Sequence, residues 1–136
     1  MGKLFLEVVT PDKVLVSQEA DMVLAPGTEG EFGILPGHVL FLSGIIPGEL
    51  RYTSGSGSEC LAVTTGFAEV SNDRVSVIVD AAEIANDIDL ERARSAVERA
   101  RVRLSKEKVG EDIDFLRAES ALKRSLARIK VAKKSL

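Results

Sequence analysis

The chain has few of the residues on which metal centres and disulfide frameworks depend. Its 136 residues include one cysteine, Cys60, one histidine, His38, and no tryptophan. These counts exclude a disulfide framework and a zinc site of the usual Cys/His kind. A single cysteine also favours a reducing compartment, because small secreted domains are commonly held by several disulfides.

Long apolar runs are absent too. No stretch approaches the roughly 18 consecutive apolar residues of a membrane-spanning helix. The first residues, MGKLFLEVVTPDK, lack the basic start, apolar plateau and cleavage site of an export signal. Apolar residues make up 45% of the chain and charged residues 29%, which argues against a disordered tail. We expect one folded domain or two small ones, without an export signal or lipid anchor.

Motifs of self-contained catalysis are also missing. The sequence has no GxxxxGK[ST] phosphate loop, no complete GxGxxG and no GxSxG elbow. Cys60 falls in a predicted buried strand, where a thiol usually acts as a small hydrophobic residue. We therefore expect a chain that is no enzyme on its own and requires no metal and no cofactor.

Charge and chain punctuation divide the sequence near Asn86–Asp87. Residues 1–88 carry 4 basic and 13 acidic side chains, whereas residues 89–136 carry 14 and 8. All four prolines and ten of the eleven glycines precede the division, a distribution typical of strands and turns followed by long helices. We predict two domains, residues 1–86 and residues 87–136.

The first part shows the period-two alternation of half-buried strands. Val75, Val77 and Val79 fall on one face of a strand. Ser71-Asn72-Asp73 before it and Gly55-Ser56-Gly57-Ser58 further upstream are typical of tight hairpin turns. Several short strands at this spacing predict an antiparallel β-sandwich or barrel.

The second part changes to the three- and four-residue spacing of helices. Two apolar seams follow that spacing: Leu90, Ala93, Val97, Ala100 and Leu104, then Phe115, Ala118, Leu122, Ser125, Ile129 and Ala132, with Leu126 widening the second. Gly110 lies between them at a helix-stop position. We predict an antiparallel two-helix hairpin. Its alanine-rich seam buries little area, so it should be only marginally stable alone.

A glycine-rich loop is the first candidate for binding. Gly30–His38 contains three glycines and a proline, which fix a loop with backbone angles that other residues tolerate poorly. The loop is either structural, with its histidine satisfying nearby backbone groups, or a partner surface carried on a rigid sheet. Physical reasoning from the residues leaves both interpretations open.

The basic hairpin admits three interpretations. Nucleic-acid binding usually adds stacking aromatics, and the only aromatic residue after Phe67 is Phe115. A membrane-surface helix needs a large apolar face, which alanine-rich seams do not offer. A basic surface that meets an acidic protein fits better.

Four arginines and one aspartate on the hairpin are a second candidate site. They are Asp89, Arg92, Arg99, Arg124 and Arg128. Helical spacing puts Arg92 and Arg99 on one flank of the first helix, and Arg124 with Arg128 on one flank of the second. When the helices fold together, these side chains could hold a small anion, because guanidinium groups match phosphate oxygens.

Three stretches form a specific combination: Gly30–His38, Ile46–Leu50 and Gly66–Val70. With them the chain resembles the epsilon subunit of the bacterial F-type ATP synthase over essentially its whole length. The resemblance implies a noncatalytic rotor subunit of a proton-translocating synthase, whose sandwich binds the gamma subunit and rests on the ring of c subunits. It also makes Glu31 and His38 candidates for that contact.

The resemblance further implies a mobile hairpin. In the family the hairpin is either folded against the sandwich or extended along gamma into the alpha/beta catalytic hexamer, where it blocks rotation in the hydrolysis direction. Membrane association would be peripheral, through the complex, at the cytoplasmic face of the bacterial inner membrane. No nucleic-acid partner is implied.

Some members of the family bind ATP in the folded hairpin through an Ile/Leu-Asp-x-x-Arg-Ala motif, which Ile88–Ala93 resembles. The implied ATP-binding residues here are Glu83, Ile88, Asp89, Arg92, Ala93, Arg99, Arg124 and Arg128. ATP would be a regulatory ligand that favours the folded hairpin through its higher affinity for that state.

Two other functions stay open from the sequence. One is a free-standing, soluble nucleotide-binding regulator, which would not co-purify with gamma. The other is a nucleic-acid-binding module, which salt-dependent binding to a duplex or RNA would reveal.

Overall fold

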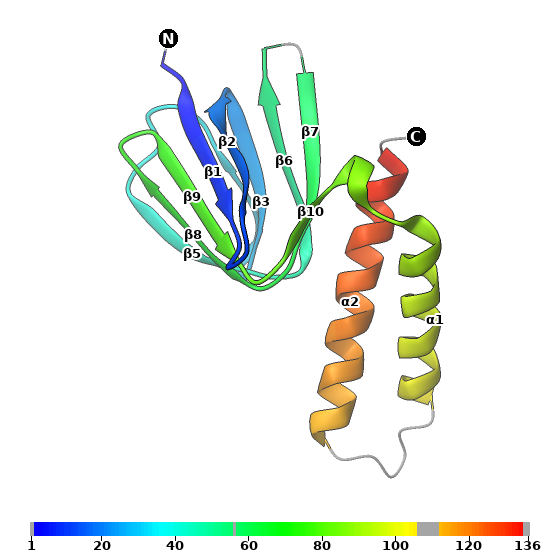
Figure 1. Ribbon diagram of the computed structural model, residues 1–136. Coiled ribbons are helices and arrows are strands. Elements are labelled where there is room, and N and C mark those ends of the chain that lie inside the picture. Colours follow the sequence, from blue (N-terminus) through cyan, green and yellow to red (C-terminus); the bar gives the residue numbers. More distant parts are fainter. Residues whose placement is uncertain (1, 56, 106–111, 135–136) are drawn as a thin grey trace.

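The structure, a computed structural model, describes residues 2–55, 57–105 and 112–134. In those ranges ten strands are followed by a short 3-10 helix and two α-helices (Figure 1). The predicted fold class, a β-sandwich or barrel followed by a helical hairpin, is confirmed. Gly110 and the side chain of Phe115 lie outside the described residues. No helix in the described ranges is both long and apolar enough to cross a membrane.

The strands form one sheet in the order β10-β7-β6-β3-β5-β8-β9-β1-β2, with β4 paired to β3. Their bounds are β1 (Leu4–Val9), β2 (Val14–Ala20), β3 (Met22–Gly27), β4 (Gly30–Ile34), β5 (Phe41–Ile45), β6 (Gly48–Ser54), β7 (Gly57–Val63), β8 (Gly66–Ser71), β9 (Arg74–Val79) and β10 (Ala82–Ile84). Among the described strands, β1 and β9 form the one parallel pair, which departs from the antiparallel prediction. The sheet curls until β2 and β10, at its two ends, contact each other.

The core lies between the inner faces of the curled sheet. Val75, Val77 and Val79 all point inward and are buried, as the alternation predicted. The largest fully buried side chains are Leu4, Leu6, Val8, Val23, Ile34, Ile45, Leu50, Leu61, Val63, Val70, Val75 and Val77. Each contributes roughly 1.5–3 kcal/mol of transfer free energy, which makes the sandwich the stable part of the molecule.

The turn that joins β8 to β9 has the predicted geometry. Asn72 and Asp73 have φ angles of 50° and 61°, the left-handed conformation that these residue types tolerate. The Asp73 side chain also accepts a hydrogen bond from the Gly37 backbone N–H at 2.7 Å. The turn therefore anchors the loop that contains His38.

A second anchor lies between β2 and β3. The Asp21 carboxylate pairs with the Lys3 ammonium group and accepts a hydrogen bond from the Gly55 N–H at 2.8 Å. Both interactions lower the pKa of Asp21 below its usual value, and the contact with Lys3 has the larger effect. The same contact raises the pKa of Lys3. By contacting both Lys3 and Gly55, Asp21 ties the N-terminal segment to the β6–β7 hairpin.

The two helices, α1 (Leu90–Ser105) and α2 (Asp112–Lys134), lie side by side (Figure 1). The central part of the predicted seam is confirmed, because its small residues are buried: Ala93, Val97 and Ala100 in α1, and Ala118, Ser125 and Ala132 in α2. The prediction that Leu126 widens the seam is wrong, since 42% of this residue is exposed.

A second face of α2 docks the hairpin on the sheet. Val131 is fully buried in a small cluster with Ala62 of β7 and Ala85 of the 3-10 helix η1 (Ala85–Asp87). Cys60 and Ile88 pack against this cluster. The seam spacing had not indicated this face, because the spacing describes only how α2 meets α1.

Gly66, at the start of β8, is predicted to be irreplaceable even by alanine. A Cβ atom at this position would lie 2.0 Å from the Ile78 carbonyl oxygen and 2.7 Å from the Val79 Cα, both backbone atoms of the neighbouring strand. We expect Gly66→Ala to lower the free energy of unfolding by about 2–3 kcal/mol, measured by urea denaturation. Gly57→Ala is the matched control, because its Cβ would meet the Ser54 carbonyl oxygen at an ordinary 3.6 Å. Equal midpoints for the two variants would contradict the prediction.

Candidate functional site

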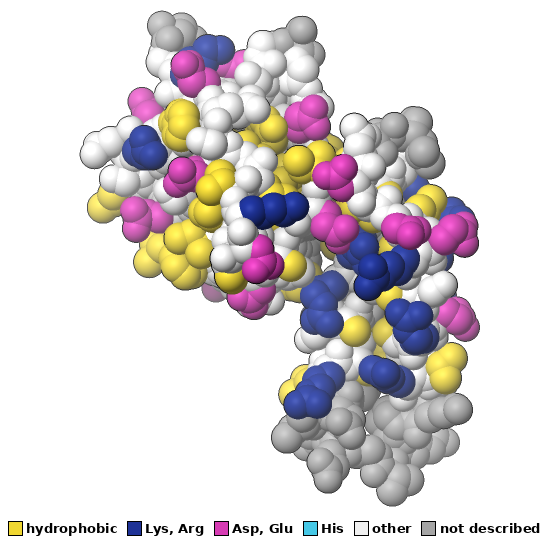
Figure 2. Space-filling view, viewed as in Figure 1, with side chains coloured by type: hydrophobic (Ala, Val, Ile, Leu, Met, Phe, Trp, Pro, Cys, Tyr) yellow, Lys and Arg dark blue, Asp and Glu magenta, His cyan; other side chains and the backbone are white. Residues whose placement is uncertain are grey.

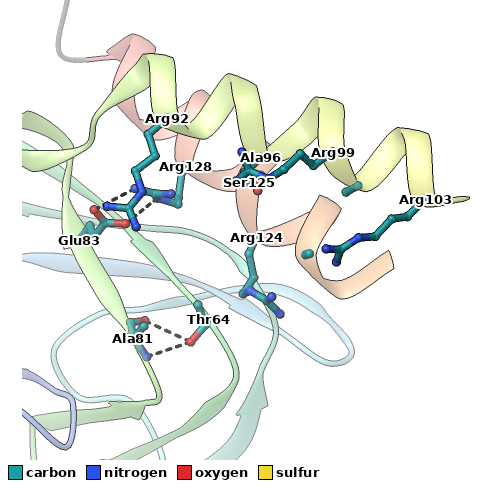
Figure 3. Close-up of a pocket in the computed structure, with 12 residues that line it drawn as sticks. Thr64, Ala81, Glu83, Arg92, Ala96, Arg99, Arg103, Arg124, Ser125 and Arg128 are labelled. Carbon is teal, nitrogen blue, oxygen red and sulfur yellow. Dashed lines mark hydrogen bonds and ion pairs between the residues drawn. The ribbon is translucent and has the colours of Figure 1, made fainter. Parts of the chain in front are cut away.

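A cavity of about 400 Å³ opens where the hairpin meets the edge of the sheet, and we call it the hairpin–sheet cavity. Its walls come from α1, α2, β10 and the turn that brings Thr64 next to Ala81 (Figure 3). The Thr64 hydroxyl donates to the Ala81 carbonyl at 3.2 Å and lies 2.9 Å from the Ala81 N–H, which donates to it. This turn forms a hydrogen-bonded border of the cavity.

Five of the eight predicted ATP-binding residues line this cavity: Glu83, Arg92, Arg99, Arg124 and Arg128. Helix geometry explains the convergence, because residues seven apart on α1 and four apart on α2 project from the same side of each helix. The antiparallel packing then turns the two sides toward each other, with Glu83 of β10 at one end (Figure 3).

The space itself comes from short side chains. Ala96 and Ala100 of α1 and Ala121 and Ser125 of α2 line the cavity between the arginines. Larger residues at these positions would fill the gap between the helices. The alanine-rich seam therefore creates the cavity as well as limiting the area that the helices bury against each other.

One ion pair links the hairpin to the sheet inside the cavity. The Arg128 Nε lies 2.6 Å from the Glu83 Oε1, and the Nη2 donates a hydrogen bond to Oε2 at 3.2 Å. The Nε–H does not point directly at its oxygen, so that contact is electrostatic rather than a hydrogen bond. Only one edge of the guanidinium is used in this way.

Positive charge dominates the lining. Five arginines border the cavity, the fifth being Arg103, and Glu83 is the one acidic residue among the lining residues that the structure describes. Figure 2 shows the same excess on the surface, where Lys and Arg side chains gather over the two helices. The arrangement suits an anion with several oxygen atoms.

The other three predicted residues occupy structural positions. The Asp89 carboxylate accepts a hydrogen bond from the Arg92 N–H at 3.1 Å and so caps α1. Ala93 is fully buried in the seam, and Ile88 packs against the docking cluster. Their side chains do not line the hairpin–sheet cavity, so a contact of these residues with ATP stays a prediction.

Sequence reasoning missed Arg103 and Thr64. Arg103 lies one turn beyond Arg99, so the spacing that selected Arg92 and Arg99 could have selected it as well. Thr64 carried no signal, because the turn that brings it to the hairpin depends on the folded sheet. Among the described residues, no group of three or more His, Cys, Asp or Glu is placed to hold a metal ion.

The sandwich carries a second candidate surface around the His38 loop. Glu31 lies exposed on β4, and the half-buried His38 ring packs 5.7 Å from the Phe41 ring. Large apolar side chains in the adjoining segment are exposed to solvent: Leu40 is 79% exposed, Val39 is 73% exposed and Leu42 is 67% exposed. Hydrophobic side chains on the sandwich surface are visible in Figure 2. Exposed apolar residues this closely spaced indicate a contact surface for another protein.

Two outward-facing residues extend this surface across the sheet. Phe67 of β8 pairs with Ile78 of β9, and both remain more than two-fifths exposed. No role for these residues, or for the apolar run at 39–42, was predicted from the sequence. The run beside a glycine-rich turn was the available signal, since an exposed loop is usually polar.

Comparison with known proteins identifies two family domains in the chain. Residues 3–85 match the beta-sandwich domain of the ATP synthase delta/epsilon chain, and residues 86–133 match its long alpha-helix domain. The ATP synthase epsilon chain of Syntrophobacter fumaroxidans is 50% identical over 76% of this chain and 78% of its own length. That of Carboxydothermus hydrogenoformans is 48% identical over the same shares.

Solved structures share the fold. A chain of the Euglena gracilis mitochondrial ATP synthase superposes with a TM-score of 0.83 at 23% identity, covering 98% of this chain and 82% of that one. A chain of the Tetrahymena thermophila mitochondrial enzyme gives 0.58 at 16% identity, over 98% and 96%. The expected role as a subunit rather than a separate enzyme agrees with the names of the relatives. The matched domains and these relatives together show that the chain belongs to the ATP synthase delta/epsilon chain family, as an epsilon chain.

Proposed function

We propose that this chain is the central-stalk epsilon subunit of a proton-translocating F-type ATP synthase, and that its hairpin senses ATP and restrains ATP hydrolysis. The observation that carries the proposal is the hairpin–sheet cavity. Arginines from two helices and a glutamate from the sheet meet there only while the hairpin is docked. The family assignment supports the place of the chain in the complex.

The sandwich is the part that holds the subunit in the stalk. The exposed apolar residues around His38 and the outward pair Phe67–Ile78 offer a surface for the gamma subunit and the c-ring, with Glu31 and His38 within it. The related Euglena structure is of an assembly that includes the c-ring. The chain would then lie peripherally at the cytoplasmic face of a bacterial inner membrane, through the complex.

ATP is the ligand that best suits the hairpin–sheet cavity. Its phosphate oxygens match the guanidinium groups of Arg92, Arg99 and Arg124, and the volume lies within the roughly 300–1,000 Å³ of small-molecule sites. Since both helices supply ligands, ATP binds the closed hairpin more tightly than an open one. ATP therefore shifts the population toward the docked state by that difference in affinity.

The docked state is held weakly enough to be reversible. Its buried cluster joins Val131 to two alanines, Ala62 and Ala85, and one partly exposed ion pair accompanies it. Released, the basic hairpin can extend along gamma toward the alpha/beta hexamer and oppose rotation in the hydrolysis direction. An inhibitor controlled in this way acts when ATP is scarce.

The apolar sandwich surface argues against a free-standing regulator. A protein that works alone in solution gains nothing from a solvent-exposed apolar patch such as Val39, Leu40 and Leu42. Stable co-purification with gamma separates the two functions, because a free regulator would be recovered without it.

ATP binding should depend on the cavity arginines. We expect Arg92→Ala and Arg124→Ala each to weaken ATP binding about tenfold or more, since each removes charge-assisted hydrogen bonds to phosphate. Isothermal titration of the purified chain with ATP measures the effect. Arg101→Ala is the control, because Arg101 is exposed on α1 and lines no part of the cavity. Unchanged affinity in both test variants would remove these arginines from the site.

The Glu83–Arg128 pair should help to hold the hairpin down. Replacing Glu83 by Gln leaves the Arg128 charge without its partner, and we expect about 1 kcal/mol of docking free energy to be lost, a modest value because both side chains are partly exposed. Hydrogen exchange of the 127–132 amides, without ATP, should then be about fivefold faster. Glu91→Gln breaks a comparable but fully surface pair with Arg94 and should leave these rates unchanged. Equal rates in the two variants would assign docking to the apolar cluster alone.

Deleting residues 87–136 should separate the two parts of the function. We expect the assembled complex to retain the truncated subunit, because the sandwich contact surface is untouched, and its ATPase activity to rise at low ATP. Steady-state ATPase assays on purified complex, with its subunit content checked on a gel, give both readouts. Loss of the subunit from the complex would show that the hairpin contributes to the gamma contact.

A further inference from the structure

A second cavity continues the groove between the helices, away from the sheet. Its volume is about 510 Å³. It is lined by Arg103, Leu116, Arg117, Ser120, Ala121 and Arg124. We call it the distal cavity. Arg103, Ala121 and Arg124 border both cavities, so the two are neighbouring compartments of one groove.

Each compartment has the volume of a complete small-molecule site. A nucleotide confined to the hairpin–sheet cavity would leave the distal cavity open. The compartments also differ in charge. Glu83 offsets one arginine in the first, whereas no acidic residue is among the described residues that line the second.

Among the described residues that line it, the distal cavity gathers three guanidinium groups and no acidic side chain. Arg124 is shared with the nucleotide, so Arg103 and Arg117 are the two that remain available to a second anion. Arg103 comes from α1, and Arg117 and Arg124 come from α2, so closing the hairpin brings like charges together. Their mutual repulsion falls when an anion lies among them. The Ser120 hydroxyl adds a neutral donor, and the side chains of Leu116 and Ala121 form an apolar part of the wall.

We propose that the distal cavity is a second anion subsite, which binds a free phosphate-type oxyanion while a nucleotide occupies the hairpin–sheet cavity. A compact oxyanion fits this place because planar guanidinium groups pair with its oxygens two at a time. Since its ligands come from both helices, the bound anion stabilises the closed hairpin. The subsite goes beyond the proposed ATP sensing and does not require it: the hairpin then responds to the level of free phosphoanions as well as to ATP.

Pyrophosphate is the probe for the test, applied to the full chain with ATP already saturating. Isothermal titration gives the affinity, and amide NMR gives the location. We expect saturable shifts at Arg103, Arg117 and Ser120, with ATP remaining bound. Arg117→Gln should weaken pyrophosphate binding about tenfold or more and leave ATP affinity unchanged, because Arg117 lines the distal cavity alone.

Two controls make the result specific. Arg92→Gln should weaken ATP binding and leave pyrophosphate binding unchanged, because Arg92 lines only the hairpin–sheet cavity. Arg101→Gln, which removes an exposed arginine that lines neither cavity, should change neither affinity. A general loss of positive charge would instead lower pyrophosphate affinity in all three variants, and that result overturns the proposal.

Three further outcomes decide the matter. Displacement of ATP by pyrophosphate, one for one, overturns the subsite, because the groove then holds a single ligand. Absence of binding at millimolar pyrophosphate in a chain that binds ATP also overturns it, and leaves the ATP proposal intact. Binding of pyrophosphate that depends on Arg117 in a chain that fails to bind ATP supports the subsite and contradicts only the ATP proposal.

Discussion

The functional geometry depends on the contact between the last turns of α2 and the sheet. Val131 inserts between Ala62 and Ala85, and one turn earlier Arg128 pairs with Glu83. One buried valine is worth roughly 1.5–3 kcal/mol, and a partly exposed ion pair adds about 1 kcal/mol at most. In the proposed function, docking lies within a few kcal/mol of balance, where a ligand with different affinities for two states can decide between them. A larger apolar contact would have fixed the hairpin permanently.

Electrostatics act on this balance in two opposite directions. The first 88 residues carry a marked acidic excess and the remainder a basic excess, so the two parts attract each other over the distance that salt allows. Inside the groove the electrostatic interaction is repulsive, because docking and hairpin closure bring arginines from α1 and α2 together around two adjoining cavities. Of the described residues that line the two cavities, only Glu83 is acidic, so it relieves this repulsion at one end. In the proposed function, anions from solution relieve the rest of this repulsion, and closure then responds to small molecules.

Local patterns predicted most of the fold and about half of the site. Asn72-Asp73 predicted a tight turn because few other residues tolerate its positive φ angles, and the helical spacing found the buried seam around Ala93 and Ala100. Leu126 was misplaced and Val131 was missed for one reason: periodicity identifies an apolar face but not which neighbour covers it. α2 has two such faces, one for α1 and one for the sheet. The placement of Thr64 beside the arginines likewise depends on strand order, which no local pattern contains.

The alanines at the helix seam connect these properties. Ala96, Ala100 and Ala121 leave room between α1 and α2, and that room is where a ligand can reach arginines from both helices. The same short side chains bury little area, so the closed hairpin gains little stability from its own packing. Leucine at these positions would make the hairpin more stable and fill the cavity at once. In the proposed function a weak seam and a binding site are therefore two consequences of one choice of residue, and a tighter hairpin could not sense a ligand in this place.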